Sequence, residues 1–324
     1  MKICIFGAGA IGGLIGGELA RAGVDVSFVA RGPHLQAMQT HGLRLRIDGA
    51  EHTVRVPCTS NPAELGPQDY VFITLKAHSV PGAVESMRPL LHADTAVITG
   101  VNGLPYWYFH DHGGDYAGTI LNSVDPGGLQ WRVLGPERGI GCVLYPAADI
   151  VAPGVVEHAY GKKFPLGEPS GQTTARIQRL HEAMTAAGFE APIRADIRDE
   201  IWLKLWGNLC LNPISALTHA TLDVITADPA VRSLARGMMQ EAQIIAERLG
   251  VRFRVGIERR LDGAGAIAGH KTSMLQDLEQ RRPMEIDPLL GVIQELGQRV
   301  GQPTPLADAV LALVRLREKT ACQG

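Results

Sequence analysis

Cysteine is scarce in this chain of 324 residues, and the few cysteines are scattered along it. They are Cys4, Cys58, Cys142, Cys210 and Cys322. Their number is odd and no two form a C-x-x-C pair, which argues against a disulfide framework and for free thiols in a reducing compartment. We therefore predict a cytoplasmic protein.

An excess of charge of either sign is also missing, because 31 Lys and Arg face 33 Asp and Glu, for a net charge of −2. Such a balance argues against nucleic acid or an anionic membrane as a partner, so any anion site must be local. No segment is apolar for long enough to span a bilayer. The hydrophobic content of 45% and the length favour two domains with sizeable cores.

The first thirty residues carry the most informative pattern. An apolar run from Ile3 to Phe6 meets Gly7, Gly9 and Gly12, and a helical pattern and a second apolar run, Val26 to Ala30, follow. This order predicts strand, tight turn, helix and strand. Glycines at such a turn let the backbone approach a pyrophosphate, whose charge is met by amides at the helix N-terminus. A plain glycine-rich turn is the alternative.

Arg31 stands where the second strand ends. NAD sites usually place an Asp or Glu there, about 20 residues past the glycines, to bind the ribose 2′-hydroxyl. No acid stands beside Arg31. Since a guanidinium can bind a 2′-phosphate, the sequence favours NADP over NAD; the alternative is a solvated surface arginine.

The first half of the chain alternates strand-like runs and helical patterns, which indicates parallel strands with crossover helices. Expected strands are 2–6, 24–30, 70–75 and 95–99, with helices near 11–22, 34–41, 80–91 and 173–187. Residues 43–47 and 53–56 read as a hairpin around Asp48-Gly49, and short runs over 139–166 as antiparallel strands that finish the sheet.

Strand signals disappear after Asp196, which with Asp199 resembles a helix start. Helices are expected over 197–217, 228–249, 272–281, 285–300 and 305–319. We therefore predict an α/β protein with an N-terminal Rossmann-type dinucleotide-binding domain, residues 1–193, followed by an all-α substrate and catalytic domain, residues 194–324.

Lys204, Asn208 and Asn212 follow one another at intervals of four in the first of these helices. They therefore line one side of the helix within roughly 80° of arc. The leucines around them make the helix look buried, and a buried helix does not carry a lysine and two amides without partners. This polar stripe is a candidate site; a solvent-facing surface is the alternative.

Other polar residues stand where parallel strands end or helices begin. Lys76 ends the expected strand 70–75 and Asn102-Gly103 follows 95–99, both on the sheet edge where such folds bind ligands. Ser273 is interpreted as the cap of a helix that Pro283 ends, and Glu285 as the entry to the next helix. These structural roles are sufficient reasons for Ser273 and Glu285.

Two short segments are less specific. His110-Asp111-His112 offers only two imidazoles beside two glycines, so we interpret it as a loop and expect no metal. The aromatic run Tyr106 to Phe109 shapes a substrate pocket or packs between domains or subunits, and packing is favoured.

Taken together, these motifs make the chain similar to the ketopantoate reductase (2-dehydropantoate 2-reductase) family over nearly its whole length. The shared motifs are Gly7-Ala-Gly-Ala-Ile-Gly12, Thr74-Leu-Lys76, Asn102-Gly103, Lys204…Asn208…Asn212-Pro and Ser273-Met-Leu-Gln-Asp…Glu285-Ile-Asp. The segment from Tyr106 to Gly114 departs from the plainer sequence that the family often has there.

The resemblance implies a role for each matching residue. Lys204 would be the catalytic general acid, and substrate would be bound by Asn208, Asn212, Ser273, Glu285 and Asn102. NADPH would contact Gly7, Ala8, Gly9, Ala10, Ile11, Gly12, Arg31, Lys76, Asn102, Ala148 and Glu285. The implied activity is NADPH-dependent reduction of a 2-oxo acid to a 2-hydroxy acid, with 2-dehydropantoate reduced to (R)-pantoate in pantothenate biosynthesis.

Three alternatives stay open. The substrate is a bulkier 2-oxo acid, the protein is a 3-hydroxyacid or opine-type dehydrogenase, or it is a non-catalytic NADP-binding sensor. The segment from Ser273 to Glu285 argues against the second alternative. The intact set of Lys204, Asn208, Asn212 and Glu285 argues against the third, since a sensor needs no general acid. The partner is a small molecule in each case, and a homodimer is compatible with the sequence.

Overall fold

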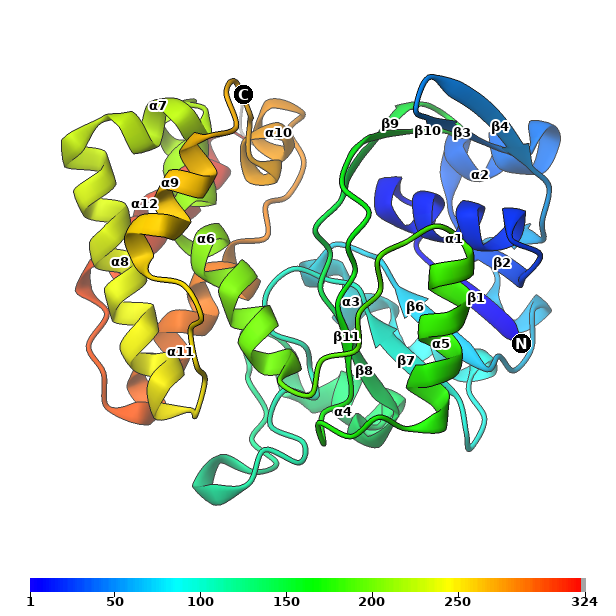
Figure 1. Ribbon diagram of the computed structural model, residues 1–324, viewed down its shortest axis with the longest axis horizontal. Coiled ribbons are helices and arrows are strands. Elements are labelled where there is room, and N and C mark those ends of the chain that lie inside the picture. The colour runs from blue at the N-terminus through cyan, green and yellow to red at the C-terminus, as the bar shows by residue number, and fades with distance from the viewer. Residues whose placement is uncertain (322–324) are drawn as a thin grey trace. The chain divides into compact units, whose positions relative to one another are not determined.

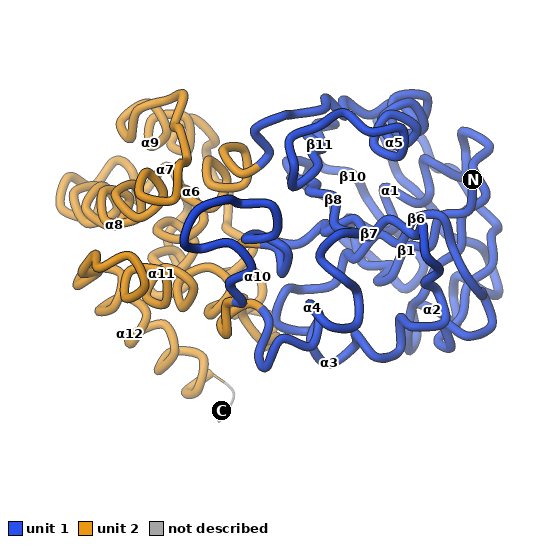
Figure 2. The backbone as a smooth tube through the Cα atoms, turned by 90° about the horizontal axis from the view of Figure 1, so that it is seen from below, with its two compact units in different colours: residues 1–101, 105–120, 125–197 blue, residues 102–104, 121–124, 198–324 orange. Residues whose placement is uncertain are grey.

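The computed structural model describes residues 1–321, and Cys322 lies outside the described residues. Contacts between Cα atoms divide the chain into two compact units, which Figure 2 distinguishes. Unit 1 comprises residues 1–101, 105–120 and 125–197; unit 2 comprises residues 102–104, 121–124 and 198–324. The sequence placed the domain boundary after residue 193, and the units change at Ile197.

Unit 1 is built on a seven-stranded sheet in the order β11-β8-β7-β6-β1-β2-β5 (Figure 1). The strands are β1 (Lys2–Phe6), β2 (Asp25–Val29), β5 (Cys58–Thr59), β6 (Tyr70–Ile73), β7 (Ala96–Thr99), β8 (Gly139–Cys142) and β11 (Leu166–Gly167). All pairs are parallel except β8 with β11. This is the expected Rossmann-type arrangement, in which the strand order reverses beside β1.

A second, four-stranded sheet in the order β4-β3-β10-β9 corrects one expectation. Its strands are β3 (Leu43–Ile47), β4 (Ala50–Val54), β9 (Ala147–Ala152) and β10 (Val155–Tyr160). The hairpin of β3 and β4 was predicted. The prediction that the runs over 139–166 all finish the main sheet was wrong for β9 and β10, because β10 pairs in parallel with β3 instead. The expected antiparallel direction was also wrong for β8, which joins the main sheet parallel to β7.

The helices of unit 1 cover these sheets. They are α1 (Ala10–Arg21), α2 (Gly32–His41), α3 (Val80–Ala83), α4 (Leu129–Leu134) and α5 (Ala175–Ala186). The single helix expected over 80–91 was wrong: α3 is followed by a 3-10 helix, Val84–Leu90, that contains Pro89. A proline inside a helix removes a hydrogen bond and clashes with the preceding turn, which explains the change.

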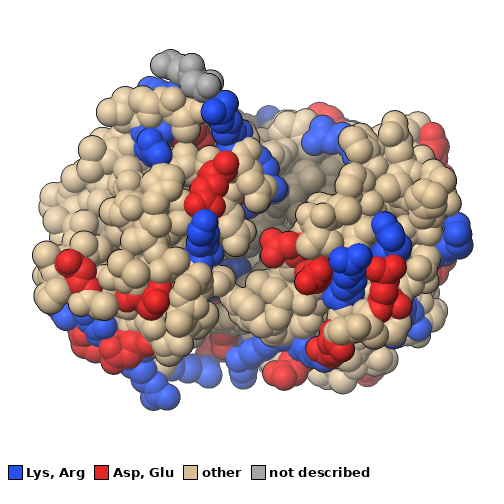
Figure 3. Space-filling model, turned by 90° about the horizontal axis from the view of Figure 1, so that it is seen from above, with Lys and Arg blue, Asp and Glu red and all other residues tan. Residues whose placement is uncertain are grey.

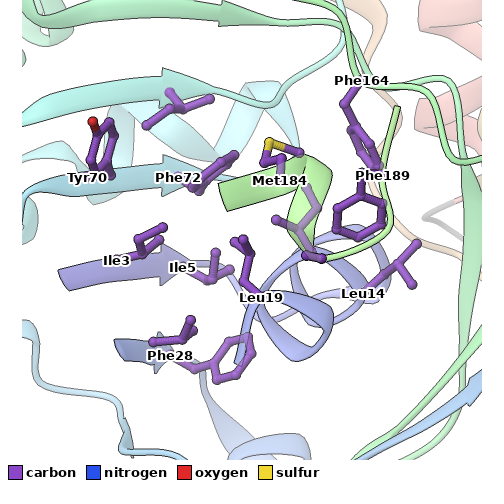
Figure 4. Packing of buried hydrophobic residues seen from close by; sticks show 14 of the residues in the cluster. Ile3, Ile5, Leu14, Leu19, Phe28, Tyr70, Phe72, Phe164, Met184 and Phe189 are labelled. Atoms are coloured by element: carbon purple, nitrogen blue, oxygen red, sulfur yellow. The ribbon is translucent and has the colours of Figure 1, made fainter. Parts of the chain in front are cut away.

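The core of unit 1 forms where the central strands meet α1 and α5 (Figure 4). Ile3, Ile5 and Phe28 are fully buried, and Leu19 of α1 and Met184 of α5 close over them. Lys2–Phe6 therefore form a buried strand, whose position in the core fixes where the following glycine turn stands.

Unit 2 is helical. Its helices are α6 (Ile197–Thr218), α7 (Leu222–Ala227), α8 (Pro229–Arg248), α9 (Ile257–Gly265), α10 (Ser273–Glu279), a π-helical turn (Asp287–Gly291), α11 (Val292–Val300) and α12 (Pro305–Ala321). The sequence analysis missed α7 and α9. Trp206 of α6 is fully buried, donates a 2.7 Å hydrogen bond to the Met239 carbonyl and packs against Phe253. This contact fixes the rotation of α6 about its axis.

No helix among residues 1–321 is long and apolar enough to cross a membrane. Acidic and basic side chains are interspersed over the face drawn in Figure 3.

Candidate active site

The glycine turn of unit 1 is held by the neighbouring strand. Gly7 follows β1 with a φ of +109°, which favours glycine. The Thr74 hydroxyl, just past β6, donates a 2.7 Å hydrogen bond to the Gly7 carbonyl. A Cβ at Gly12 would clash with that carbonyl and with Thr74, and would come within 3.0 Å of Ile5. The first and last glycines are therefore needed to close the turn itself.

Gly9 has a different environment. It is the N-cap of α1, makes no side-chain cap, and a Cβ built on it would meet no atom within 4 Å. The amides of Ala10, Ile11 and Gly12 stand in the first turn of a helix, where backbone N–H groups have no intrahelical partner. An open helix start with free donors fits a pyrophosphate, so the described residues can hold a dinucleotide here.

Arg31 lies one residue past the buried Ala30 and is the N-cap of α2. Its side chain is exposed and makes no hydrogen bond or ion pair with residues 1–321. A free guanidinium at the end of β2 fits a phosphate on the ribose. Lys76 is half-buried just after β6, and Ala148 stands in β9 of the smaller sheet.

The polar stripe of unit 2 lies on α6. Lys204 and Asn208 are half-buried and Asn212 is 6% exposed, whereas Trp202, Trp206 and Leu209 are fully buried. The stripe thus becomes less accessible toward the C-terminal end of the helix. Its accessible part holds the one lysine, at a position from which a flexible cation can reach a bound molecule.

Asn102 and Glu285 are 183 residues apart in sequence and meet within unit 2. The Asn102 side-chain amide donates a 2.9 Å hydrogen bond to the Glu285 carboxylate, which is 4% exposed. Gly103, with a φ of +85°, lies against the carbonyl of Pro288, so a side chain there would clash. Close packing on Pro288 therefore keeps Asn102 beside Glu285.

The structural interpretation of Ser273 was wrong. Thr272 is the N-cap of α10, and its hydroxyl accepts a 3.2 Å hydrogen bond from the Leu275 amide. Ser273 is the first residue of the helix and is exposed. Its hydroxyl is not used as a cap, which leaves it able to contact a ligand.

The aromatic run packs inside unit 1. All four rings, from Tyr106 to Phe109, are at most 4% exposed, and Trp107 donates a 3.1 Å hydrogen bond to Thr99. Gly139 and Gly141 of β8 lie directly against Trp107, which leaves no room for side chains there.

Sequence reasoning also missed Thr74 as the residue that holds Gly7 through a hydrogen bond. Thr74 stands in the same motif as Lys76, and this position is the signal that could have identified it.

An open, mainly parallel sheet with a glycine turn after its first strand, followed in sequence by a helical unit, is the architecture of a two-domain dinucleotide-dependent oxidoreductase. Comparisons with known proteins agree. Residues 3–106 match the family model "Ketopantoate reductase PanE/ApbA", and residues 196–318 match the model of its C-terminal part.

Three relatives are similar over nearly their whole length. A 2-dehydropantoate 2-reductase of Mesorhizobium japonicum is 58% identical over 316 residues, 97% of each chain. A ketopantoate reductase structure from Ralstonia solanacearum is 40% identical, with a TM-score of 0.94 over 98% of each chain. A 2-dehydropantoate 2-reductase structure from Geobacter metallireducens is 28% identical, with a TM-score of 0.85 over 98% of this chain and 99% of that one. The chain belongs to the ketopantoate reductase family.

Proposed function

We propose that the protein reduces a 2-oxo acid to a 2-hydroxy acid with NADPH, and that the acid is 2-dehydropantoate, which gives (R)-pantoate. The observation that carries this proposal is the partly accessible Lys204 of α6, which lies on the same side of the helix as Asn208 and Asn212. The chain that holds it is 58% identical to a 2-dehydropantoate 2-reductase. The family supplies the reaction type, and the lysine supplies the acid that the reaction needs.

NADPH, when bound, supplies a hydride to the carbonyl carbon. We assign its pyrophosphate to the amides of residues 9–12, because the amides of Gly7 and Ala8 already donate to the Val29 carbonyl. We assign its 2′-phosphate to Arg31, the free guanidinium at the end of β2. Lys76, Asn102, Ala148 and Glu285 are further proposed contacts, on the basis of the resemblance.

Lys204 is the proposed general acid. Negative charge develops on the carbonyl oxygen as its carbon gains a hydride, and the protonated amine stabilises that charge. Lys204 Nζ then gives a proton to the oxygen, which completes the hydroxyl group. Asn208, Asn212 and Ser273 would bind the remaining polar groups of the acid without adding charge. Glu285, held by Asn102, would orient the acid beside the cofactor.

The direct test is NADPH oxidation by the purified protein with 2-dehydropantoate and a panel of larger 2-oxo acids. 3-Hydroxy acids with NADP are assayed in parallel. We expect the highest kcat/KM with 2-dehydropantoate. A preference for a larger 2-oxo acid would change the substrate and keep the reaction, whereas turnover of 3-hydroxy acids alone would contradict the proposal. Tight NADPH binding with no turnover of any acid would favour a sensor.

The cytoplasmic location predicted from the scattered cysteines and the compatibility with a homodimer stay predictions. The four cysteines among residues 1–321 are free thiols. Light scattering of the purified protein would give the oligomeric state.

A further inference from the structure

Arg260 of α9 lies against α6 at Gly207, one turn from Lys204. A Cβ built on Gly207 would be 2.9 Å from Cζ of Arg260 and 3.2 Å from its Nε. The guanidinium therefore occupies the space that a side chain at position 207 would need. Gly207 itself is buried, and Arg260 is half-buried.

The guanidinium of Arg260 has no acceptor among residues 1–321, with which it makes no hydrogen bond or ion pair. The acids of α9 are already engaged, since Glu258 and Asp262 both pair with Arg232 of α8. A half-buried guanidinium has five donors to satisfy, and such groups normally have partners. The structure thus presents a cation that fits an anionic ligand.

The position of Arg260 relative to Lys204 follows from helix geometry. Seen down α6, Gly207 lies about 60° to one side of Lys204 and Asn208 about 40° to the other. Positions three apart on a helix have Cβ atoms about 5–6 Å apart. Arg260 and the two amides of the stripe therefore flank Lys204 from opposite sides.

We propose that Arg260 binds the carboxylate of the 2-oxo acid while Lys204 faces the adjacent carbonyl oxygen. The carboxylate is bonded directly to the carbonyl carbon, so a guanidinium at Gly207 and an amine from Lys204, three residues apart on α6, can each face one of the two groups. A guanidinium can hold a carboxylate through two parallel hydrogen bonds, which also orients the acid. The amides and Ser273 are left for the rest of the molecule. This inference rests on the proposed reductase function.

The test compares Arg260→Gln with Arg259→Gln, its exposed neighbour in α9. The probe is 3,3-dimethyl-2-oxobutanoate, assayed against its methyl ester, which lacks the negative charge. We expect Arg260→Gln to raise KM for the acid at least about tenfold, with kcat within about threefold, as for loss of a hydrogen bond to a charged group. The acid-to-ester ratio of kcat/KM should fall by at least the same factor.

Arg259→Gln should match the wild type in KM, in the acid-to-ester ratio, in NADPH affinity and in melting temperature. Gly207→Ala is a second route to the same result, because its methyl group displaces the guanidinium while Arg260 is retained. Arg260→Lys should show more of the acid preference than Arg260→Gln, since lysine keeps the positive charge. It should show less than the wild type, since lysine lacks the paired donors of the guanidinium.

Equal acid-to-ester ratios in Arg260→Gln, Gly207→Ala and the wild type would overturn the inference and leave the reductase function standing. A lower kcat with an unchanged ratio would also overturn it, because that result indicates a structural role. If the wild type and Arg259→Gln reduce no 2-oxo acid at all, the proposed function itself fails.

Discussion

The side chains of Asn102 and Glu285 form a 2.9 Å hydrogen bond across 183 residues of sequence. Asn102 comes just after β7, but its contacts are those of unit 2. The carboxylate of Glu285 is almost fully buried, and a buried charge needs donors. The bond therefore stabilises the fold of unit 2 as well as being a feature of the candidate site.

Asn102→Ala should lower the free energy of unfolding by about 1–3 kcal/mol, because a buried carboxylate loses a donor. Urea denaturation measures the change. A double-mutant cycle with Glu285→Ala isolates the pair, and we expect a coupling of about 0.5–3 kcal/mol. Strictly additive effects would show that the two residues act independently.

Lys204→Ala should reduce kcat by about 10²–10⁴-fold or more, the range for loss of a general acid, with NADPH affinity within about threefold of the wild type. Stopped-flow NADPH oxidation and fluorescence titration give the two quantities. Lys204→Met controls for packing, since it keeps the length of the side chain and removes the charge. Near-normal turnover in either variant would remove Lys204 from its proposed role.

Gly9→Ala and Gly12→Ala should separate nucleotide binding from folding. Gly12→Ala forces a methyl group against the Gly7 carbonyl and Ile5, so we expect it to destabilise unit 1 by about 1–3 kcal/mol. Gly9→Ala meets no protein atom and should cost at most about 1 kcal/mol, while weakening NADPH binding tenfold or more. Thermal unfolding and fluorescence titration measure the two effects, and unchanged NADPH affinity in Gly9→Ala would argue against a pyrophosphate at this turn.

Arg31→Ala should weaken NADPH binding by about tenfold to a hundredfold and leave NADH binding unchanged, because only NADPH carries the 2′-phosphate. Stability should stay within about 0.5 kcal/mol, since the side chain is exposed. Arg132→Ala, at another exposed arginine of unit 1, serves as the control. An equal loss of affinity for both nucleotides would contradict the assignment.

Local patterns explain which of these features could be predicted from the sequence. The strand, turn and helix over residues 2–21 follow from neighbouring residues, and so does the stripe on α6. The pairing of β10 with β3 joins segments more than a hundred residues apart, and no local pattern specifies such a register.

The same distinction applies within the candidate site. Lys204, Asn208 and Asn212 could be identified from the pattern of one helix. Asn102 and Glu285 could be assigned to the same site only through the family resemblance. Nothing in the sequence separates Arg260 from Arg259, because the difference is the glycine on a distant helix against which one of them lies.

The acid stability of unit 2 should depend on Glu258, which connects α9 to α8. Hydrogen bonds from Arg236 and Arg232 lower the pKa of this carboxyl to about 2. The pKa of this carboxyl is higher in the unfolded chain. The stabilisation by the ion pairs is therefore fully present above the unfolded pKa and is lost as the pH falls toward 2. Glu258→Gln should therefore lower the melting temperature only slightly at pH 7, because the carboxylate is exposed, and should have little effect near pH 2. Melting curves of the variant and the wild type over this pH range measure the difference in melting temperature. A difference that stays constant down to pH 2 would mean that packing, and not charge, holds α9 in place.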